Sequence, residues 1–159
     1  MSTSSQIRSA WSSGVWSNAT ITAITTKIYS YDLVASIKSK PEAASMYYNQ
    51  AINFFTYTVN RTRVSQEIKG ASGSAQRYEF EVIVNYYLQK DLTDAAQNYN
   101  NVIDRLETVD GIVISGLAKT WASTVSYYEM SGILTPTLIE LDDREVWRGG
   151  YSYKAVQQV

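Results

Sequence analysis

Carboxylate pairs are the residues of this sequence whose spacing suits acid–base or metal chemistry. Asp142 and Asp143 are adjacent, and Glu79 and Glu81 are separated by one residue. Such pairs can bind Mg²⁺ or divide the roles of general acid and general base. A metal site also needs further oxygen ligands that converge on it, and the sequence indicates no such set. We therefore interpret the pairs as a solvated turn and a solvated strand face, and expect no metal site.

Histidine and cysteine are both absent from the 159 residues. This removes the commonest general base, the thiolate nucleophile, disulfides and the usual zinc ligands. A serine–lysine pair is the nucleophilic arrangement that survives, with candidates at residues 36–38 and 39–40. These lie in a polar linker beside Pro41, where we expect no desolvated lysine. The glycines form no phosphate-binding pattern, so we expect no catalytic residue and no cofactor.

Basic residues gather around the ends of one predicted hairpin: Arg61, Arg63, Lys69 and Arg77. With tyrosines nearby, such a cluster could contact a nucleic-acid backbone. The alternative is pairing with Glu67, Glu79 and Glu81 across the hairpin, which we favour because opposite charges on paired strands are routine. The 14 Lys and Arg against 15 Asp and Glu give a formal charge of −1, which implies no strong overall attraction to nucleic acid.

The length suits one domain, residues 1–159, with its own core. No window approaches the roughly 18 to 20 consecutive apolar residues of a membrane helix, and no signal peptide is visible. We therefore expect no membrane contact. The aromatic residues are skewed, with 13 Tyr and 4 Trp against 3 Phe. Tyrosine is favoured where one end of the ring is buried and the other stays wet, as at interfaces and on half-exposed sheets.

Helical spacing of apolar residues predicts two helices. Residues 5–17 form the first, and residues 92–109 form the second, which we expect to end at Asp110 and Gly111. Residues 20–31 have helical spacing but are rich in β-branched Thr and Ile, which prefer strands. Their state stays open between helix and strand.

A long antiparallel hairpin is predicted from residues 51–64 and 77–88, joined by a flexible tip at residues 65–76. In its second strand, apolar and polar side chains alternate, which predicts one buried and one polar face. Ile83 and Tyr87 interrupt the polar face and indicate that part of it is covered as well.

The C-terminal third predicts further strands. Segments 124–130 and 136–141 form two of them, and segment 146–156 forms the last, with a bulge at Gly149 and Gly150. The order of elements predicts an α+β fold: an antiparallel or mixed sheet of about four strands with helices packed on one face.

The closing stretch combines an acidic turn, a tryptophan that enters the last strand and a strand that carries tyrosines. It runs from Ile139 through Asp142, Asp143 and Arg144 to Trp147, and continues as Tyr151, Ser152 and Tyr153. The strand and helix of residues 78–106, after an N-terminal helix, complete the order. In these features the chain resembles the tail terminator proteins of long-tailed bacteriophages.

The resemblance implies a structural virion protein of the tail or neck, made in the host cytoplasm, without enzymatic activity. Members of that family form a hexameric ring that caps the tail tube, stops its polymerisation and offers a surface to neck or head-completion proteins. The basic residues Arg61, Arg63, Lys69 and Arg77 would then face a partner or the central channel, near DNA. The residues Asp142, Asp143 and Arg144 would form a polar turn at another surface.

Two other functions stay open. A head–tail connector or another tail-completion protein of the neck shares the small α+β architecture and ring assembly. A small hydrolase, built on a carboxylate pair or a serine–lysine dyad, belongs to a different class. A ring subunit needs contact surfaces more than a pocket, and a tyrosine-rich chain without histidine or cysteine favours that role.

Overall fold

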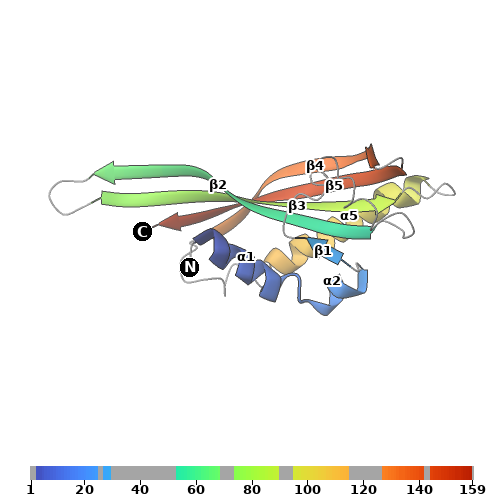
Figure 1. Ribbon diagram of the computed structural model, residues 1–159, viewed down its shortest axis with the longest axis horizontal. Coiled ribbons are helices and arrows are strands. Elements are labelled where there is room, and N and C mark those ends of the chain that lie inside the picture. Colours follow the sequence, from blue (N-terminus) through green and yellow to red (C-terminus); the bar gives the residue numbers. More distant parts are fainter. Residues whose placement is uncertain are drawn as a thin grey trace.

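The computed structural model describes residues 3–24, 27–29, 53–68, 74–89, 95–114, 127–141 and 144–158. They form one β-sheet with helices packed against one of its faces (Figure 1). The predicted α+β class, with helices on one face, is confirmed. Within these ranges no helix is long and apolar enough to cross a bilayer.

The long strands are β2 (Asn53–Ile68), β3 (Ser74–Gln89), β4 (Tyr127–Leu141) and β5 (Arg144–Gln158). They lie in the order β2-β3-β5-β4, and every neighbouring pair is antiparallel. A short strand, β1 (Lys27–Tyr29), pairs parallel to β2 and adds one strand to the four predicted. The sheet is therefore mixed, and its two hairpins meet where β3 pairs with β5.

The helices of the described ranges are α1 (Thr3–Gly14), α2 (Ala19–Ile24) and α5 (Ala95–Ile112). The open segment 20–31 therefore contains both states, because α2 is followed there by β1. The predicted stop at Gly111 was wrong: α5 runs to Ile112, and residues 113–114 add a π-helical turn. A glycine lowers helix propensity by only about 1 kcal/mol, which packing of the helix outweighs.

The core lies between the sheet and the helices. Alternate residues of β3, namely Phe80, Val82, Val84 and Tyr86, are at most 4% exposed, as the sequence predicted. They belong to one buried cluster with Val102, Leu106 and Val109 of α5 and with residues of α1 and β5. The face of β3 that alternation predicted to be buried is thus the face that the helices cover.

Helix α1 is anchored by aromatic rings. Trp11 is fully buried, and its ring centroid lies 5.9 Å from that of Trp16 and 5.5 Å from that of Tyr153. Trp16 in turn lies 5.4 Å from Phe55 and 5.3 Å from Tyr57. These rings connect α1 to β2 and β5, so a helix rich in serine is held to the sheet by a few large side chains.

Many of the tyrosines serve the core of this subunit. Tyr57, Tyr86, Tyr87 and Tyr153 are at most 4% exposed. Their hydroxyl groups reach polar partners: Tyr153 donates to Asp110 Oδ1 at 3.0 Å, and the Tyr57 hydroxyl lies 2.9 Å from Ser12 Oγ. The abundance of tyrosine, which suggested contact surfaces, is thus partly explained by rings buried inside the subunit.

Replacing Tyr153 with Phe is expected to lower the free energy of unfolding by about 1 to 2 kcal/mol, because Asp110 loses a donor. Burial, and then the charge of Asp110, raise the pKa of Tyr153 above its ordinary value of 10.0. The unfolded chain releases this proton near its ordinary pKa while the folded chain keeps it. The stability is therefore full below about pH 10 and falls as the pH rises above it.

Urea unfolding at about pH 8 and about pH 11 tests this linkage. Tyr153→Phe should lose less stability between the two pH values than the wild type does. Tyr86 and Tyr151, whose pKa values burial also raises, account for a remaining loss. Equal losses in variant and wild type would show that Tyr153 does not couple ionisation to folding.

The face of the sheet away from the helices, which we call the second face, is buried at one end. Phe54 of β2 and Tyr87 of β3 are register partners whose rings stack with centroids 4.9 Å apart. Each is 1% exposed, and Ile83 on the same face is half-buried. The expectation that part of this face is covered is confirmed at Tyr87.

The β2–β3 hairpin is longer than predicted. Its pairing continues to Ile68 opposite Ser74, whereas the sequence predicted a loop over residues 65–76. The prediction of a loop was wrong at both ends, since residues 65–68 pair with residues 74–77. Strand pairing joins backbone groups and needs no apolar side chains. Residues 69–73, which connect the two strands, lie outside the described residues.

Strand β4 is continuous, where the sequence predicted two strands separated near Ser131. Its register with β5 shifts between Met130 and Gly132 and again between Leu134 and Thr137. Bulges therefore let one strand absorb the residues that suggested a break. They also interrupt the regular ladder of an edge strand, which discourages uncontrolled pairing with other chains.

The bulge predicted at Gly149 and Gly150 does not lie in β5, which pairs with β3 without any register shift. It lies in the facing part of β4. Gly149 instead meets helix α5: an added Cβ would lie 2.7 Å from Val102 Cγ1 and 3.1 Å from Leu106 Cδ1. The glycine thus permits the close packing of α5 on the sheet.

Candidate functional site

Strands β2 and β3 continue beyond the helices as a ribbon, which we call the arm (residues 61–68 and 74–79). In Figure 1 the arm projects from one end of the molecule, and the end of β5 runs beside its base. Gln158 of β5 still pairs with Arg77, and further out β2 and β3 pair only with each other among the described strands. The arm therefore offers strand edges to another molecule.

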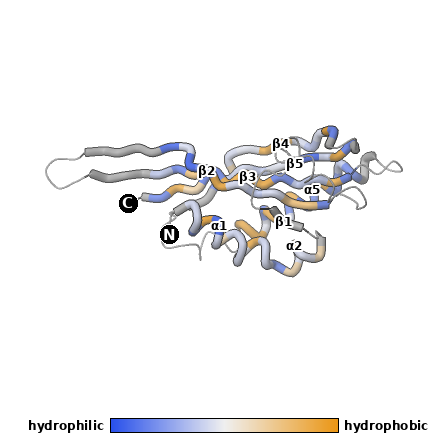
Figure 2. The backbone as a smooth tube through the Cα atoms, viewed as in Figure 1, coloured by the Kyte–Doolittle hydropathy of each residue, from blue (hydrophilic) through white to orange (hydrophobic). Residues whose placement is uncertain are grey.

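A bulge separates two exposed arginines on the arm. The register shifts between Arg61 and Arg63, with Thr62 as the extra residue, whose hydroxyl donates to the Glu79 carbonyl at 3.3 Å. Arg61 lies opposite Phe80 and Arg63 opposite Glu79, so the two arginines occupy opposite faces of the ribbon. Figure 2 shows hydrophilic residues where the arm leaves the body.

Of the hairpin carboxylates, Glu79 and Glu81 have described side chains, and neither forms an ion pair with these two arginines. Glu79 Oε1 lies 3.4 Å from Nζ of Lys154 on β5, although Arg63 is its register partner on β2. Lys154 is also the register partner of Glu81. Within the described part of the chain, Arg61 and Arg63 form no ion pair. The arm thus presents two exposed positive charges that no described side chain of the molecule pairs with.

The other predicted site residues are divided between the two ends of the sheet. Arg77 lies in the arm, and Lys69 lies outside the described residues. Asp142 and Asp143 also lie outside them, and Arg144 begins β5 at the end of the sheet far from the arm (Figure 1). Among the described residues, Arg144 therefore lies far along the sheet from Arg61, Arg63 and Arg77 of the arm.

Edge strand β4 carries most of the exposed large apolar side chains in the described ranges. On this strand Met130, Ile133, Leu134 and Leu138 are 37%, 68%, 38% and 43% exposed. Helix α5 packs mainly on β5 and β3, which leaves β4 at the margin of the helical layer. Exposed apolar residues gathered on one element indicate a contact surface.

A shallow hollow of about 210 Å³ opens on the second face, where β5 lies between β3 and β4. Two glycines in the lining of the hollow allow neighbouring groups to approach closely. A Cβ added at Gly132 would lie 2.7 Å from Ser152 Oγ, and one added at Gly150 would lie 2.7 Å from the Val84 carbonyl oxygen. The strands pack closely along the hollow because these two positions carry no side chain.

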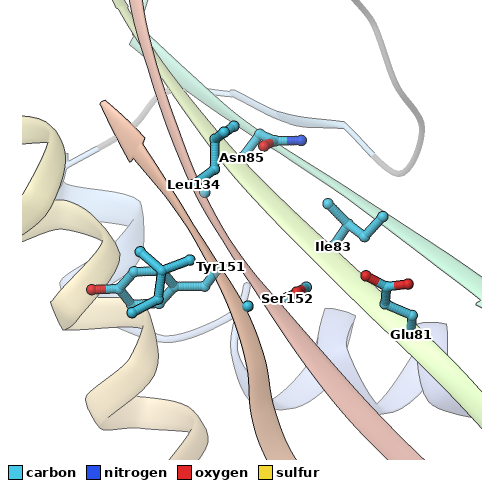
Figure 3. Close-up of a pocket in the computed structure, with 9 residues that line it drawn as sticks. Glu81, Ile83, Asn85, Leu134, Tyr151 and Ser152 are labelled. Carbon is cyan, nitrogen blue, oxygen red and sulfur yellow. The ribbon is translucent and has the colours of Figure 1, made fainter. Parts of the chain in front are cut away.

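The walls of this hollow combine apolar groups with one carboxylate. In Figure 3, Glu81, Ile83 and Asn85 stand in a row along β3, and Leu134 approaches Asn85 from β4. Glu81 and Ile83 are half-buried, and Leu134 is exposed. An open hollow of this kind fits a protruding side chain of another protein better than an enclosed small molecule.

A second hollow, of about 550 Å³, lies between α1 and β2. Its lining residues are Ser5, Arg8, Ser9, Ser12, Ser13 and Tyr57. Their polar groups already bind one another: Arg8 donates to Ser5 Oγ at 3.0 Å, and Ser13 donates to the Ser9 carbonyl at 2.9 Å. Polar groups of this hollow already form hydrogen bonds within helix α1. It is therefore a weaker candidate for a binding site than the first hollow.

The residues considered for chemistry form no convergent group in the described ranges. No set of three or more Asp and Glu there could hold a metal ion. Glu79 is engaged by Lys154, and the serine–lysine candidates at residues 36–40 lie outside the described residues. The surface features that the structure does bring forward are the arm, the apolar edge strand and the hollow.

Sequence reasoning found the arginines of the arm but missed the hollow and the apolar edge. Gly150 was visible as a glycine of the last predicted strand, whereas Gly132, Ile133 and Leu134 fell in the predicted break between residues 130 and 136. The structure places all three in the continuous strand β4. The signal that could have found them is the edge position of β4, which Pro136 suggests because proline is confined to edges and bulges.

No model of a known protein family matches the chain. A comparison with curated protein sequences also found no match. Fold and surface thus define an α+β protein with a projecting hairpin and an exposed apolar edge strand, and these features are the basis for its function.

Proposed function

We propose that this chain is a structural subunit of a bacteriophage tail, a tail terminator that assembles as a ring, caps the tail tube and presents a surface to neck proteins. The proposal joins the resemblance of the closing stretch to the geometry of the surface. It requires a subunit that works through contacts with its own copies and with the tube, without catalysis.

The observation that carries the proposal is the arm. A two-stranded ribbon is marginally stable alone, so a protein that extends one beyond its core leaves backbone groups available to a partner. The exposed apolar residues of β4 supply a second contact surface at another edge. Two different surfaces on one subunit suit a heterologous contact, which closes into a ring when the rotation per subunit divides a full turn.

Removing the arm tests the proposal. Residues 64–78 are replaced by Asn-Gly, which joins Arg63 to its register partner Glu79 through a two-residue turn. The core should still fold, because its buried residues on β3 begin at Phe80. The trimmed protein should fail to stop the polymerisation of tail tube protein, so tubes measured by electron microscopy should continue to grow, whereas the full chain should limit them.

A matched control is Ala23→Ser on α2, at an exposed position away from the arm and β4. This variant should cap tubes as the wild type does. A trimmed protein that unfolds cooperatively and still stops tube growth would contradict the role of the arm. A full chain that remains a 17.9 kDa monomer in the presence of tubes would contradict ring assembly itself.

A further inference from the structure

Among the described residues, the second face carries three glutamates, Glu79, Glu81 and Glu129, around one lysine, Lys154. Lys154 is the register partner of both Glu81 on β3 and Glu129 on β4. Its Nζ lies 3.4 Å from Glu79 instead. Within the described residues, Glu81 and Glu129 form no ion pair, and Glu129 is exposed while Glu81 lines the hollow.

The arm carries the complementary features. Arg61 and Arg63 are exposed, and the bulge at Thr62 places one of them on each face of the ribbon. The hollow offers apolar walls for the aliphatic part of an arginine and a carboxylate for its guanidinium group. This arrangement suits arginine, which buries its stem against apolar surface and binds carboxylates through a planar fork.

The outer part of the arm extends away from the hollow of its own molecule. Strand β3 passes through both, since residues 74–79 belong to the arm and residues 81–85 line the hollow. Pairing of β3 with β5 has no register shift that would fold the arm back. The ribbon beyond Arg63 therefore leads away from the hollow of its own molecule, so a ribbon that covers the hollow comes from a second molecule.

We propose that the arm of one subunit docks on the second face of a second copy of this chain, with the arginine on its docked side against Glu81 and Glu129 and its ribbon over the hollow. Because donor and acceptor surfaces differ, the contact is heterologous and repeats around an assembly. The contact rests on the surfaces above, and only its closure into a ring rests on the proposed function.

Charge reversal tests this contact. The arm variant carries Arg61→Glu and Arg63→Glu, and the acceptor variant carries Glu81→Arg and Glu129→Arg. Each should associate about ten-fold or more weakly than the wild type in sedimentation equilibrium, because like charges then meet in the contact. An equimolar mixture of the two, or one chain with all four substitutions, should recover most of the association.

A matched control replaces two carboxylates with arginines, as the acceptor variant does, but on helix α5 and away from the proposed contact. Asp104→Arg with Glu107→Arg alters two exposed carboxylates of α5 and should leave association unchanged.

If a charge-reversal variant fails to fold, disulfide cross-linking replaces the association measurement, since the chain contains no cysteine of its own. Thr62→Cys on the arm with Thr135→Cys on β4, both at exposed positions, should give a ladder of disulfide-linked oligomers. Neither single cysteine should give one.

The outcomes separate the two proposals. Reversal variants that associate as strongly as the wild type, a wild type that does not self-associate, or an absent disulfide ladder would overturn this docking. Covalent dimers from Thr62→Cys alone would overturn it in favour of an arm-to-arm contact. A wild type that self-associates through these residues but leaves tube growth unaffected would overturn the tail role and support the docking.

Discussion

Trp11→Ala is expected to lower the free energy of unfolding by about 3 to 5 kcal/mol, a large share of the roughly 5 to 15 kcal/mol of a typical domain. The side chain is fully buried and contacts the rings of Trp16 and Tyr153. Its removal leaves a cavity where α1 meets the sheet, which the remaining rings cannot fill without moving. Denaturant unfolding at a fixed protein concentration measures the loss, because association would otherwise add stability.

Two further variants make this test specific. Trp11→Phe keeps an aromatic ring in the cluster and should lose clearly less stability than Trp11→Ala. Ser9→Ala changes an exposed residue of the same helix and should stay within about 0.5 kcal/mol of the wild type. If Trp11→Ala were as mild as Ser9→Ala, the aromatic cluster would not be what holds α1 to the sheet.

Gly149→Val should destabilise the protein by about 1 to 3 kcal/mol through overpacking. Even a single Cβ at this position would lie 2.7 Å from Val102 Cγ1 and 3.1 Å from Leu106 Cδ1. A valine adds two methyl groups where helix α5 already touches the strand. Helix and sheet must then separate, and the thermal unfolding midpoint should fall together with the free energy of unfolding.

Gly111→Ala is the matched control for Gly149→Val, because Gly111 has open space where a side chain would be added. A Cβ there would meet no atom within 4 Å, and the residue lies near the end of α5. The substitution should raise stability by about 0.5 to 1 kcal/mol, because alanine loses less backbone entropy in a helix. Opposite signs for the two substitutions would confirm that close packing makes Gly149 necessary; equal signs would refute it.

The sequence predicted the structure best for a strand that is covered by helices on one face only. Alternation in β3 predicted its buried face correctly because the helices cover only that side. The outer part of the hairpin was predicted as a loop because its side chains show no alternation of apolar and polar residues. Its backbone nevertheless pairs as two strands up to Ile68. Residues 20–31 could not be assigned because a helix and a strand share that short segment.

The candidate surface was less accessible to sequence reasoning than the fold. Arg61 and Arg63 were found from their charge, but the bulge between them is a property of register and places them on opposite faces. The lining of the hollow brings together Gly132 and Gly150 from neighbouring strands that the sequence does not pair. Contacts between distant segments thus determine what the surface offers, while local patterns determine which elements carry it.

The unbroken register between β3 and β5 has a mechanical consequence. The arm is attached to β3 at one end of the sheet, and the turn that begins β5 lies at the other end. Tension applied between these two points pulls the antiparallel strands past each other. It loads all the hydrogen bonds between them in shear at the same time, whereas peeling would open them one by one. The subunit is thus built to resist stretching along the direction of its sheet.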